Sequence, residues 1–245
     1  MFRWLRSYLL LLRWSMLRLK FMLPLMLIIQ TMLAVGIVIG FSFLMPEVDK
    51  TTALYLSTGA PTLGLITVGM VLAPQMIATA KTEGTFEYNR TLPVPRSAIL
   101  AADVSIWLAT SLPGLALALL TATLRFDLDL NISPAVVPAI LLVALTATAI
   151  GYAIAYAAPA ALASLLAQLI VFIALMFSPI NFPAERLPGW LQAVHQALPF
   201  QYMAEAVRST LTVPADGISA TPFLVLAVWC VVGLALTLRI MTRRP

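Results

Sequence analysis

Six long runs of apolar residues divide this chain, and they limit its possible folds more than any other feature. They cover about residues 21–45, 55–79, 98–124, 134–157, 160–180 and 219–240. A helix needs about 20 mostly apolar residues to cross the roughly 30 Å of hydrocarbon in a bilayer. Hydrophobic residues make up 61% of the chain and charged residues only 10%, which is far from the composition of a soluble domain. The sequence therefore predicts an all-α integral membrane protein, a single domain over 1–245 with six transmembrane helices.

The basic residues are distributed unevenly between the two sides of these predicted helices. Six spans place the N-terminal segment, the segment 80–97 and the C-terminal tail on one side. Those three segments hold Arg3, Arg6, Arg13, Arg18, Lys20, Lys81, Arg90, Arg96, Arg239, Arg243 and Arg244, whereas the other side holds Lys50, Arg125, Arg186 and Arg208. Lys and Arg near span ends are retained in the cytoplasm. We therefore expect a multi-pass protein of the cell membrane with both termini cytoplasmic, and the net charge of +5 indicates topology rather than a nucleic-acid partner.

The first twenty residues are basic and precede the first apolar run. A cleaved secretory signal has an apolar region of about 7–15 residues, but this run extends from Phe21 to Met45, so we expect the segment to stay attached. On a helical wheel its bases and its leucines occupy different arcs. This predicts an amphipathic interfacial helix over 1–20, with Trp4, Tyr8 and Trp14 as interfacial anchors. A basic flank that only fixes orientation is the alternative interpretation.

The chain carries few residues suited to chemistry. It has no GxxxxGK(S/T) phosphate loop, no HExxH and no GxSxG motif, so no ATP hydrolysis by that loop is expected. Cys230 and His195 are each the only residue of their type, and we interpret His195 as a surface or packing residue; no metal site is predicted. Asp103 lies near the cytoplasmic end of the third run, where an acid costs less than at mid-bilayer. We interpret Asp103 as an interfacial or packing residue, although its role stays open.

The segment 80–97, AKTEGTFEYNRTLPVPRS, is the most polar interruption between the apolar runs. Thr82 or Thr85 is suited to cap a short helix that contains Glu83, Phe86, Glu87 and Arg90, because Thr is a good N-cap residue. Pro93 and Pro95 then end helical structure before the third run. Such a helix below the membrane is a suitable contact for a partner, and an ordinary connecting loop is the alternative.

This segment resembles the cytoplasmic segment of ABC-2 type transporter permeases. The residues that match are Glu83, Gly84, Thr85, Phe86, Glu87, Pro93, Val94, Arg96, Ile99 and Leu100. Two positions depart from the family pattern: Pro95 stands where Ser is usual, and Asp103 lies near a position where many members carry Lys. The second departure means that no role of that basic residue transfers to this chain.

A second resemblance to the same family lies at 181–217, between the fifth and sixth runs. The matching residues are Pro183, Leu187, Pro188, Trp190, Leu191, Pro199, Tyr202, Glu205 and Arg208. Pro188 and Pro199 are each suited to the first turn of a helix, and apolar residues repeat at helical spacing after both. The resemblance implies a short helical hairpin in the outer leaflet that lines or closes the exit of a path. A hairpin that only stabilises the outer rim is the alternative.

The resemblance implies the membrane-spanning permease of an ATP-binding cassette exporter, a non-catalytic subunit. Its partners would be two ATP-binding subunits, which carry ATP and Mg, a second permease chain, identical or related, and the lipid bilayer. The expected contacts with the ATP-binding subunits are Glu83, Gly84, Thr85, Phe86, Glu87, Arg90, Pro93 and Arg96. The expected residues of the extracellular gate are Trp190, Pro199, Tyr202, Glu205 and Arg208.

The nearly uncharged spans favour an amphiphilic or apolar cargo. The short outer loops look most like the drug and antibiotic exporters, and a lipid, glycolipid or polysaccharide exporter is the alternative within the family. From other classes, an ATP-independent secondary transporter or channel predicts ionisable residues or inverted repeats in the spans, and an intramembrane enzyme predicts a convergent catalytic set. The sequence offers neither pattern.

Overall fold

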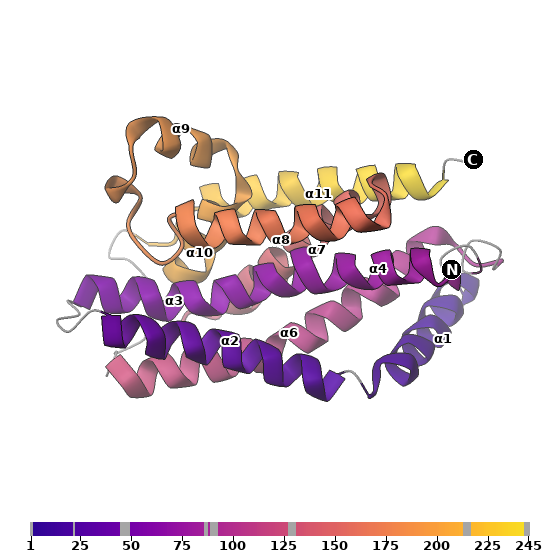
Figure 1. The fold of residues 1–245 in the computed structure, drawn as a ribbon, viewed down its shortest axis with the longest axis horizontal. Helices are drawn as coiled ribbons and strands as arrows, with labels where there is room; N and C mark the ends of the chain where they lie inside the picture. Colours follow the sequence, from indigo (N-terminus) through magenta and orange to yellow (C-terminus); the bar gives the residue numbers. More distant parts are fainter. Residues whose placement is uncertain are drawn as a thin grey trace.

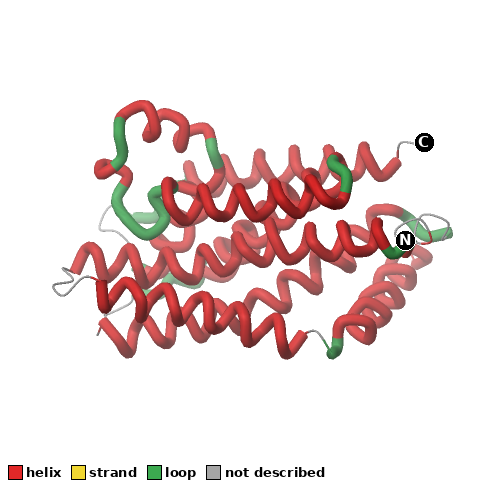
Figure 2. The backbone as a smooth tube through the Cα atoms, in the orientation of Figure 1, coloured by secondary structure: helices red, strands yellow, loops and turns green. Residues whose placement is uncertain are grey.

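The computed structural model describes residues 2–21, 23–44, 50–85, 88, 93–126, 131–212 and 217–242. Regular structure in these ranges is helical, apart from one bridge between Asn131 and Thr212 (Figures 1 and 2). The elements are α1 (Phe2–Leu19), α2 (Leu23–Leu44), α3 (Lys50–Thr67), the π-helical turn η1 (Val68–Leu72), α4 (Ala73–Thr82), α6 (Arg96–Phe126), α7 (Val136–Ala157), α8 (Ala160–Phe177), the 3-10 turn η2 (Ala184–Arg186), α9 (Gly189–Ala197), α10 (Pro199–Leu211) and α11 (Thr221–Thr242).

Within the described ranges, five helices are long and apolar enough to cross a membrane. They are Thr51–Thr82, Arg96–Phe126, Val136–Ala157, Ala160–Phe177 and Thr221–Thr242, and each matches one of the predicted runs. This confirms an all-helical integral membrane protein. The remaining run corresponds to α2, a helix of 22 residues and therefore about 33 Å long, which packs against α3 and α6. Its role as a sixth span stays a prediction.

The first of these long helices is continuous from α3 through η1 to α4. One turn of it, η1, is a wider π-helical turn. Pro74 has no N–H with which to bond the carbonyl of Met70, and its ring would collide with that carbonyl in a regular α-helix. In η1 the N–H of Ala73 instead bonds the carbonyl of Val68, five residues back. The π turn thus accommodates the proline without ending the helix.

The bundle has two distinct ends. Both termini lie at one end, which we call the terminal end, and α9 and α10 lie at the other, which we call the hairpin end (Figure 1). The connection from α4 to α6 and the turn from α7 to α8 are at the terminal end. Helix α1 also lies there and packs against α6. The long helices therefore alternate in direction between the two ends.

Helix α7 is central to the packing, because it contacts α11, η1, α4 and α10. Small residues on α7 allow this close approach. A Cβ on Gly151 would overlap the carbonyl oxygen of Gly69, and a Cβ on Gly69 would lie 2.6 Å from the Cβ of Ala147. On another face of α7, a Cβ on Gly233 of α11 would lie 3.0 Å from the Cβ of Ala149. Backbones pack directly at these points, as they do between helices in membranes.

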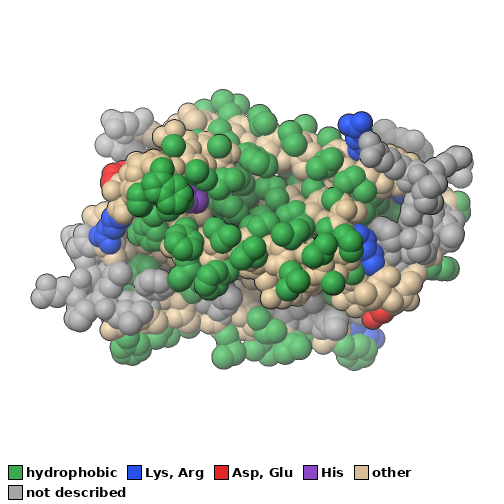
Figure 3. Space-filling model, turned by 45° about the horizontal axis from the view of Figure 1, so that its top comes forward, with side chains coloured by type: hydrophobic (Ala, Val, Ile, Leu, Met, Phe, Trp, Pro, Cys, Tyr) green, Lys and Arg blue, Asp and Glu red, His purple; other side chains and the backbone are tan. Residues whose placement is uncertain are grey.

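The surface of the bundle is apolar over its middle. Figure 3 shows hydrophobic side chains across the centre of one face and charged side chains toward its two ends. Helix α8 contributes many of them, including the exposed Leu165, Leu169 and Phe172. A band of this kind matches a protein whose middle lies in hydrocarbon.

Candidate functional sites at the two ends of the bundle

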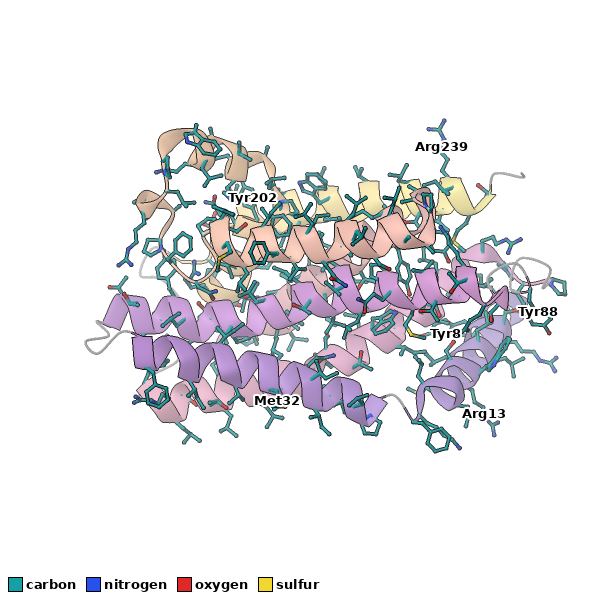
Figure 4. All side chains as sticks on the ribbon, viewed as in Figure 1. Tyr8, Arg13, Met32, Tyr88, Tyr202 and Arg239 are labelled. Carbon is teal, nitrogen blue, oxygen red and sulfur yellow. The ribbon has the colours of Figure 1, made fainter. Side chains whose placement is uncertain are left out.

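The two regions that the sequence singled out lie at opposite ends of the bundle. Tyr88, in the connection between α4 and α6, lies at the terminal end, and Tyr202, in α10, lies at the hairpin end (Figure 4). Tyr88 and Tyr202 are therefore separated by the length of the bundle. Any communication between them must pass along the long helices.

Helix α4 ends through Glu83 and Gly84. Glu83 is the C-cap of α4, and its N–H bonds the carbonyl of Thr79 at 2.9 Å. Gly84 follows with φ of +75°, a left-handed conformation that costs other residues roughly 1–2 kcal/mol and that commonly ends helices. Glu83 and Gly84 are both exposed, so this turn is accessible from outside the bundle.

The short helix predicted after Thr82 begins later than expected. The hydroxyl of Thr82 bonds back to the carbonyl of Thr79 at 2.9 Å, so Thr82 does not act as an N-cap, and Glu83 belongs to the end of α4 instead of the short helix. Thr85 and Tyr88 are helical, and the N–H of Tyr88 bonds the carbonyl of Gly84 at 3.2 Å. Phe86, Glu87 and Arg90 lie outside the described residues.

Two prolines precede α6, as expected. Pro93 and Pro95 are exposed and non-helical, and α6 begins at Arg96. The carbonyl of Pro95 accepts bonds from the N–H groups of Ala98 at 2.9 Å and Ile99 at 3.3 Å. Pro95 therefore lies at the start of α6. A proline in place of the usual Ser removes no hydrogen bond of the helix, because an N–H at this position has no partner within the helix.

Helix α1 is attached to the start of α6 by its aromatic residues. The indole N–H of Trp4 donates to the hydroxyl of Ser97 at 3.0 Å, and the hydroxyls of Tyr8 and Ser105 are hydrogen-bonded at 2.9 Å. The rings of Trp4 and Tyr8 stack with centroids 5.6 Å apart. Two of the residues expected as interfacial anchors thus also bind protein. Trp14 is exposed.

At the hairpin end, α9 and α10 form the two short helices that the prolines predicted. Pro188 precedes α9, and Pro199 is the buried first residue of α10 after the extended Leu198. The hydroxyl of Tyr202 donates to the carbonyl of Gln196 at 2.8 Å, which fixes the bend between the helices. Trp190 and Val194 of α9 are exposed, at 70% and 45%, whereas Leu198, which follows α9, packs against the core.

Arg208 joins α10 to two other parts of the bundle. Its Nε donates to the hydroxyl of Thr58 in α3 at 3.1 Å, and Nη2 donates to the carbonyl of Ile180 at 2.7 Å. The guanidinium also lies 3.8 Å from the ring centroid of Tyr55. Burial lowers the pKa of Arg208 to about 10, while Tyr55 and Glu205 oppose the shift. Arg208 is therefore well partnered, and it connects α3, α10 and the end of α8.

Glu205 lies one turn before Arg208 and lines a cleft of about 340 Å³ with Tyr55, Gln201 and Ser209. Burial raises the pKa of the Glu205 carboxyl, and the charge of Arg208 counteracts part of that rise. The cleft holds acidic, basic and neutral polar groups beside an aromatic ring. It is suited to contact an amphiphile or to hold water at this end of the bundle.

His195 packs inside the hairpin. It is 2% exposed, and its Nε2 is 3.0 Å from the carbonyl oxygen of Phe177. Burial lowers the pKa of His195, against the effect of that carbonyl. The described residues contain no group of three His, Cys, Asp or Glu side chains that could hold a metal ion. The structure thus places His195 in a packing role.

Sequence reasoning missed the partners of the charged residues. Tyr55, Thr58 and Ile180 surround Arg208, and Lys81, which indicated only topology, bonds two carbonyls near the end of α7. For Lys81 a signal exists in the sequence. Pro159 removes the donor that the carbonyl of Ala155 would normally have, which predicts a side-chain donor nearby but not its identity.

Long apolar helices, an exposed polar turn between two of them and a helical hairpin before the last one define a multi-pass membrane protein with polar sites at both ends. Comparison with protein-family models matches residues 6–212 to the ABC-2 type transporter family. The match covers most of the chain, so the chain belongs to the ABC-2 type transporter family. It is the membrane domain of an ABC permease, a kind of subunit that is generally non-catalytic. No curated protein matches the chain.

Proposed function

We propose that this chain is the membrane-spanning permease subunit of an ATP-driven exporter in the cell membrane, with six spans and its terminal end in the cytoplasm. Helix α2 is the sixth span, and α1 lies in the headgroup layer beside it. The distribution of basic residues supports this orientation, since Lys and Arg are retained on the cytoplasmic side. The terminal end carries bases on α1, on both sides of the connection from α4 to α6, and on α11, among them Arg13, Lys81, Arg96 and Arg239.

The exposed turn between α4 and α6 carries the proposal. It connects two spanning helices at the end of the bundle where both termini lie, and Glu83, Gly84 and Tyr88 are exposed there. Two separate ATP-binding subunits, which hold ATP and Mg, dock on this turn. The docking residues are Glu83, Gly84, Thr85, Phe86, Glu87, Arg90, Pro93 and Arg96. When ATP closes those subunits, the turn is displaced and the population of permease conformations shifts.

The hairpin of α9 and α10 forms the extracellular gate of the path. Arg208 supports this role, because its bonds to Thr58 and Ile180 tie α10 to α3 and to the end of α8. A movement of these helices therefore changes the position of α10. The gate residues are Trp190, Pro199, Tyr202, Glu205 and Arg208, and the cleft beside Glu205 lies at the exit.

The cargo is an amphiphilic or apolar molecule of the drug or antibiotic class. The few charges within the spanning helices support this class, since a highly charged cargo needs charged partners in the path. A lipid, glycolipid or polysaccharide is the alternative cargo. A second permease chain, identical or related, completes the path.

Co-purification from the native membrane tests this function. We expect the wild-type chain to bring down an ATP-binding subunit, and the complex to hydrolyse ATP. Glu83→Ala and Phe86→Ala should lose coupling between hydrolysis and transport, whereas Arg186→Ala at the hairpin end serves as the matched control. Wild-type transport in both Glu83→Ala and Phe86→Ala would overturn the role of the turn.

A further inference from the structure

Lys81 makes the most unusual polar contact at the terminal end. It lies in the last turn of α4, and its Nζ donates to the carbonyl of Ala155 at 2.6 Å and to that of Ala158 at 2.8 Å. Both carbonyls belong to the end of α7 and the turn into α8. Lys81 therefore bonds the helix that leads into the exposed turn to the end of the central helix.

The local sequence explains why α7 needs this donor. In a regular helix the carbonyl of Ala155 accepts from the N–H of residue 159, but residue 159 is proline and has none. Ala158 is extended, with ψ of 155°, so the helix ends there and its last carbonyls have no partner within α7. An ammonium group at a helix C-terminus also meets the negative end of the helix dipole. Lys81 is thus a C-terminal cap supplied by another helix.

The helix that leaves the exposed turn also bonds to α7. The indole N–H of Trp107 in α6 donates to the hydroxyl of Tyr152 at 2.9 Å, and both residues are buried. Tyr152 and Ala155 are one turn apart on α7. The helices on both sides of the turn are therefore tied to the same two turns of α7.

At its other end, α7 meets the hairpin. Just before α7 begins, the N–H of Ser133 donates to the carbonyl of Thr210 in α10 at 2.9 Å, and Asn131 is bridged to Thr212. Within the core, Val143 and Ala147 of α7 pack in one cluster with Met203 and Val207 of α10. Helix α7, with 22 residues and a length of about 33 Å, therefore joins the terminal end to the hairpin end.

We infer that Lys81 is a positioning residue that transmits displacement of the exposed turn to α7 and, through α7, to the α9–α10 hairpin. The inference rests on the proposed function for the source of the displacement. Coupling of this kind appears as a response at the hairpin when the input acts at the terminal end.

The first experiment uses the complex with its ATP-binding subunit. A Cys230→Ala, Val194→Cys variant carries an environment-sensitive fluorophore on the exposed side of α9, where Val194 is 45% exposed, and ATP with Mg is added. Lys81→Met, which keeps the length of the side chain and removes its donors, should reduce the ATP-induced fluorescence change about tenfold, as expected for loss of a charge-assisted contact. Lys81→Arg should retain most of the change, and ATP hydrolysis should persist in both variants.

Arg239→Met is the matched control, because Arg239 is an exposed cation at the same end of the bundle and points away from it (Figure 4). It should leave the fluorescence change intact. A normal response in Lys81→Met, an equal loss in Arg239→Met, or no response in the wild-type background would overturn the inference. If no ATP-binding subunit co-purifies, the proposed function fails instead, and the capping of α7 by Lys81 is tested separately.

That separate test uses the chain alone. Hydrogen exchange of the amides at the end of α7, including Ala158, which bonds Ile154 at 3.0 Å, should be about tenfold faster in Lys81→Met than in wild type or Lys81→Arg, because a frayed helix end exposes its amides. If Lys81→Met does not fold, Lys81→Gln replaces it in both experiments, with a smaller effect of the same direction. An unchanged rate of hydrogen exchange at the end of α7 in the folded variant would contradict the capping role of Lys81 and therefore the inference.

Discussion

The guanidinium of Arg208 lies over the ring of Tyr55, with Cζ 3.8 Å from the ring centroid. The two residues come from α10 and α3, and the same guanidinium bonds Thr58 and Ile180. One side chain thus holds three segments together at the hairpin end. Because its hydrogen bonds are partly buried, Arg208 matters to stability as well as to the proposed gate.

Replacing Arg208 should therefore destabilise the fold. Arg208→Met removes two hydrogen bonds and the contact with Tyr55, and it leaves the buried carbonyl of Ile180 without this donor. We expect the free energy of unfolding to fall by about 2–4 kcal/mol, measured by tryptophan fluorescence during thermal unfolding in detergent. Arg186→Met, at an exposed arginine of the same end, should change it little. Equal shifts in the two variants would contradict the structural role of Arg208.

Gly59 should tolerate no side chain. A Cβ there would overlap Oδ1 of Asn181 and lie 2.7 Å from the carbonyl oxygen of Ile180, the same carbonyl that Arg208 bonds. We expect Gly59→Ala to lower the free energy of unfolding by about 1–3 kcal/mol. The matched control is Gly64→Ala in the same helix, where a Cβ meets nothing within 4 Å, and which should be neutral or stabilising by up to about 1 kcal/mol. A larger loss of unfolding free energy in Gly64→Ala than in Gly59→Ala would contradict the close packing of Gly59 against Ile180 and Asn181.

Glu205 should make the fold less stable as pH rises. Burial raises the pKa of its carboxyl above the ordinary value of 4.5, so the folded chain holds the proton at pH values where the unfolded chain has released it. The contribution of Glu205 to stability is full below 4.5 and is lost as pH rises through the higher folded pKa. Glu205→Gln should therefore raise the unfolding temperature at pH 7 and not at pH 4. An unfolding temperature unaffected by the substitution at both pH values would show that the carboxyl is not destabilised by burial.

The orientation predicts which residues are accessible from each side of the membrane. In a Cys230→Ala background, a membrane-impermeant maleimide should label Trp190→Cys in intact cells and Tyr88→Cys only after permeabilisation. Both positions are exposed, at 70% and 57%, so burial does not explain a difference between them. Labelling of Tyr88→Cys in intact cells would contradict the proposed orientation.

Five of the predicted runs form helices long and apolar enough to span a membrane, and they were predictable because hydropathy and length determine them. The two helices of the hairpin were predictable because Pro188 and Pro199 each lie at the start of a helix. For the short helix after α4, the sequence offered Thr82 or Thr85 as the N-cap. Thr82 is not the cap, because its hydroxyl bonds the carbonyl of Thr79 in the last turn of α4, and Thr85 is itself helical.

Contacts between distant segments were not predictable. Arg208 and Thr58 are 150 residues apart, and no local pattern relates them. In the sequence, Lys81 indicated only topology. The fold places it beside the C-terminal end of α7, just before Pro159. The sequence predicted one uninterrupted span over 55–79 and gave no sign of the π turn that accommodates Pro74, where α3 and η1 pack closely against α7.

The central claim is that a separate ATP-binding subunit docks on the turn between α4 and α6. A photo-crosslinking amino acid at Tyr88, compared with one at Trp190 at the opposite end, tests it most directly in native membranes. Mass spectrometry should identify an ATP-binding subunit with a phosphate loop crosslinked to position 88 and not to position 190. Failure to capture such a subunit at position 88, or its capture at position 190, would contradict the claim.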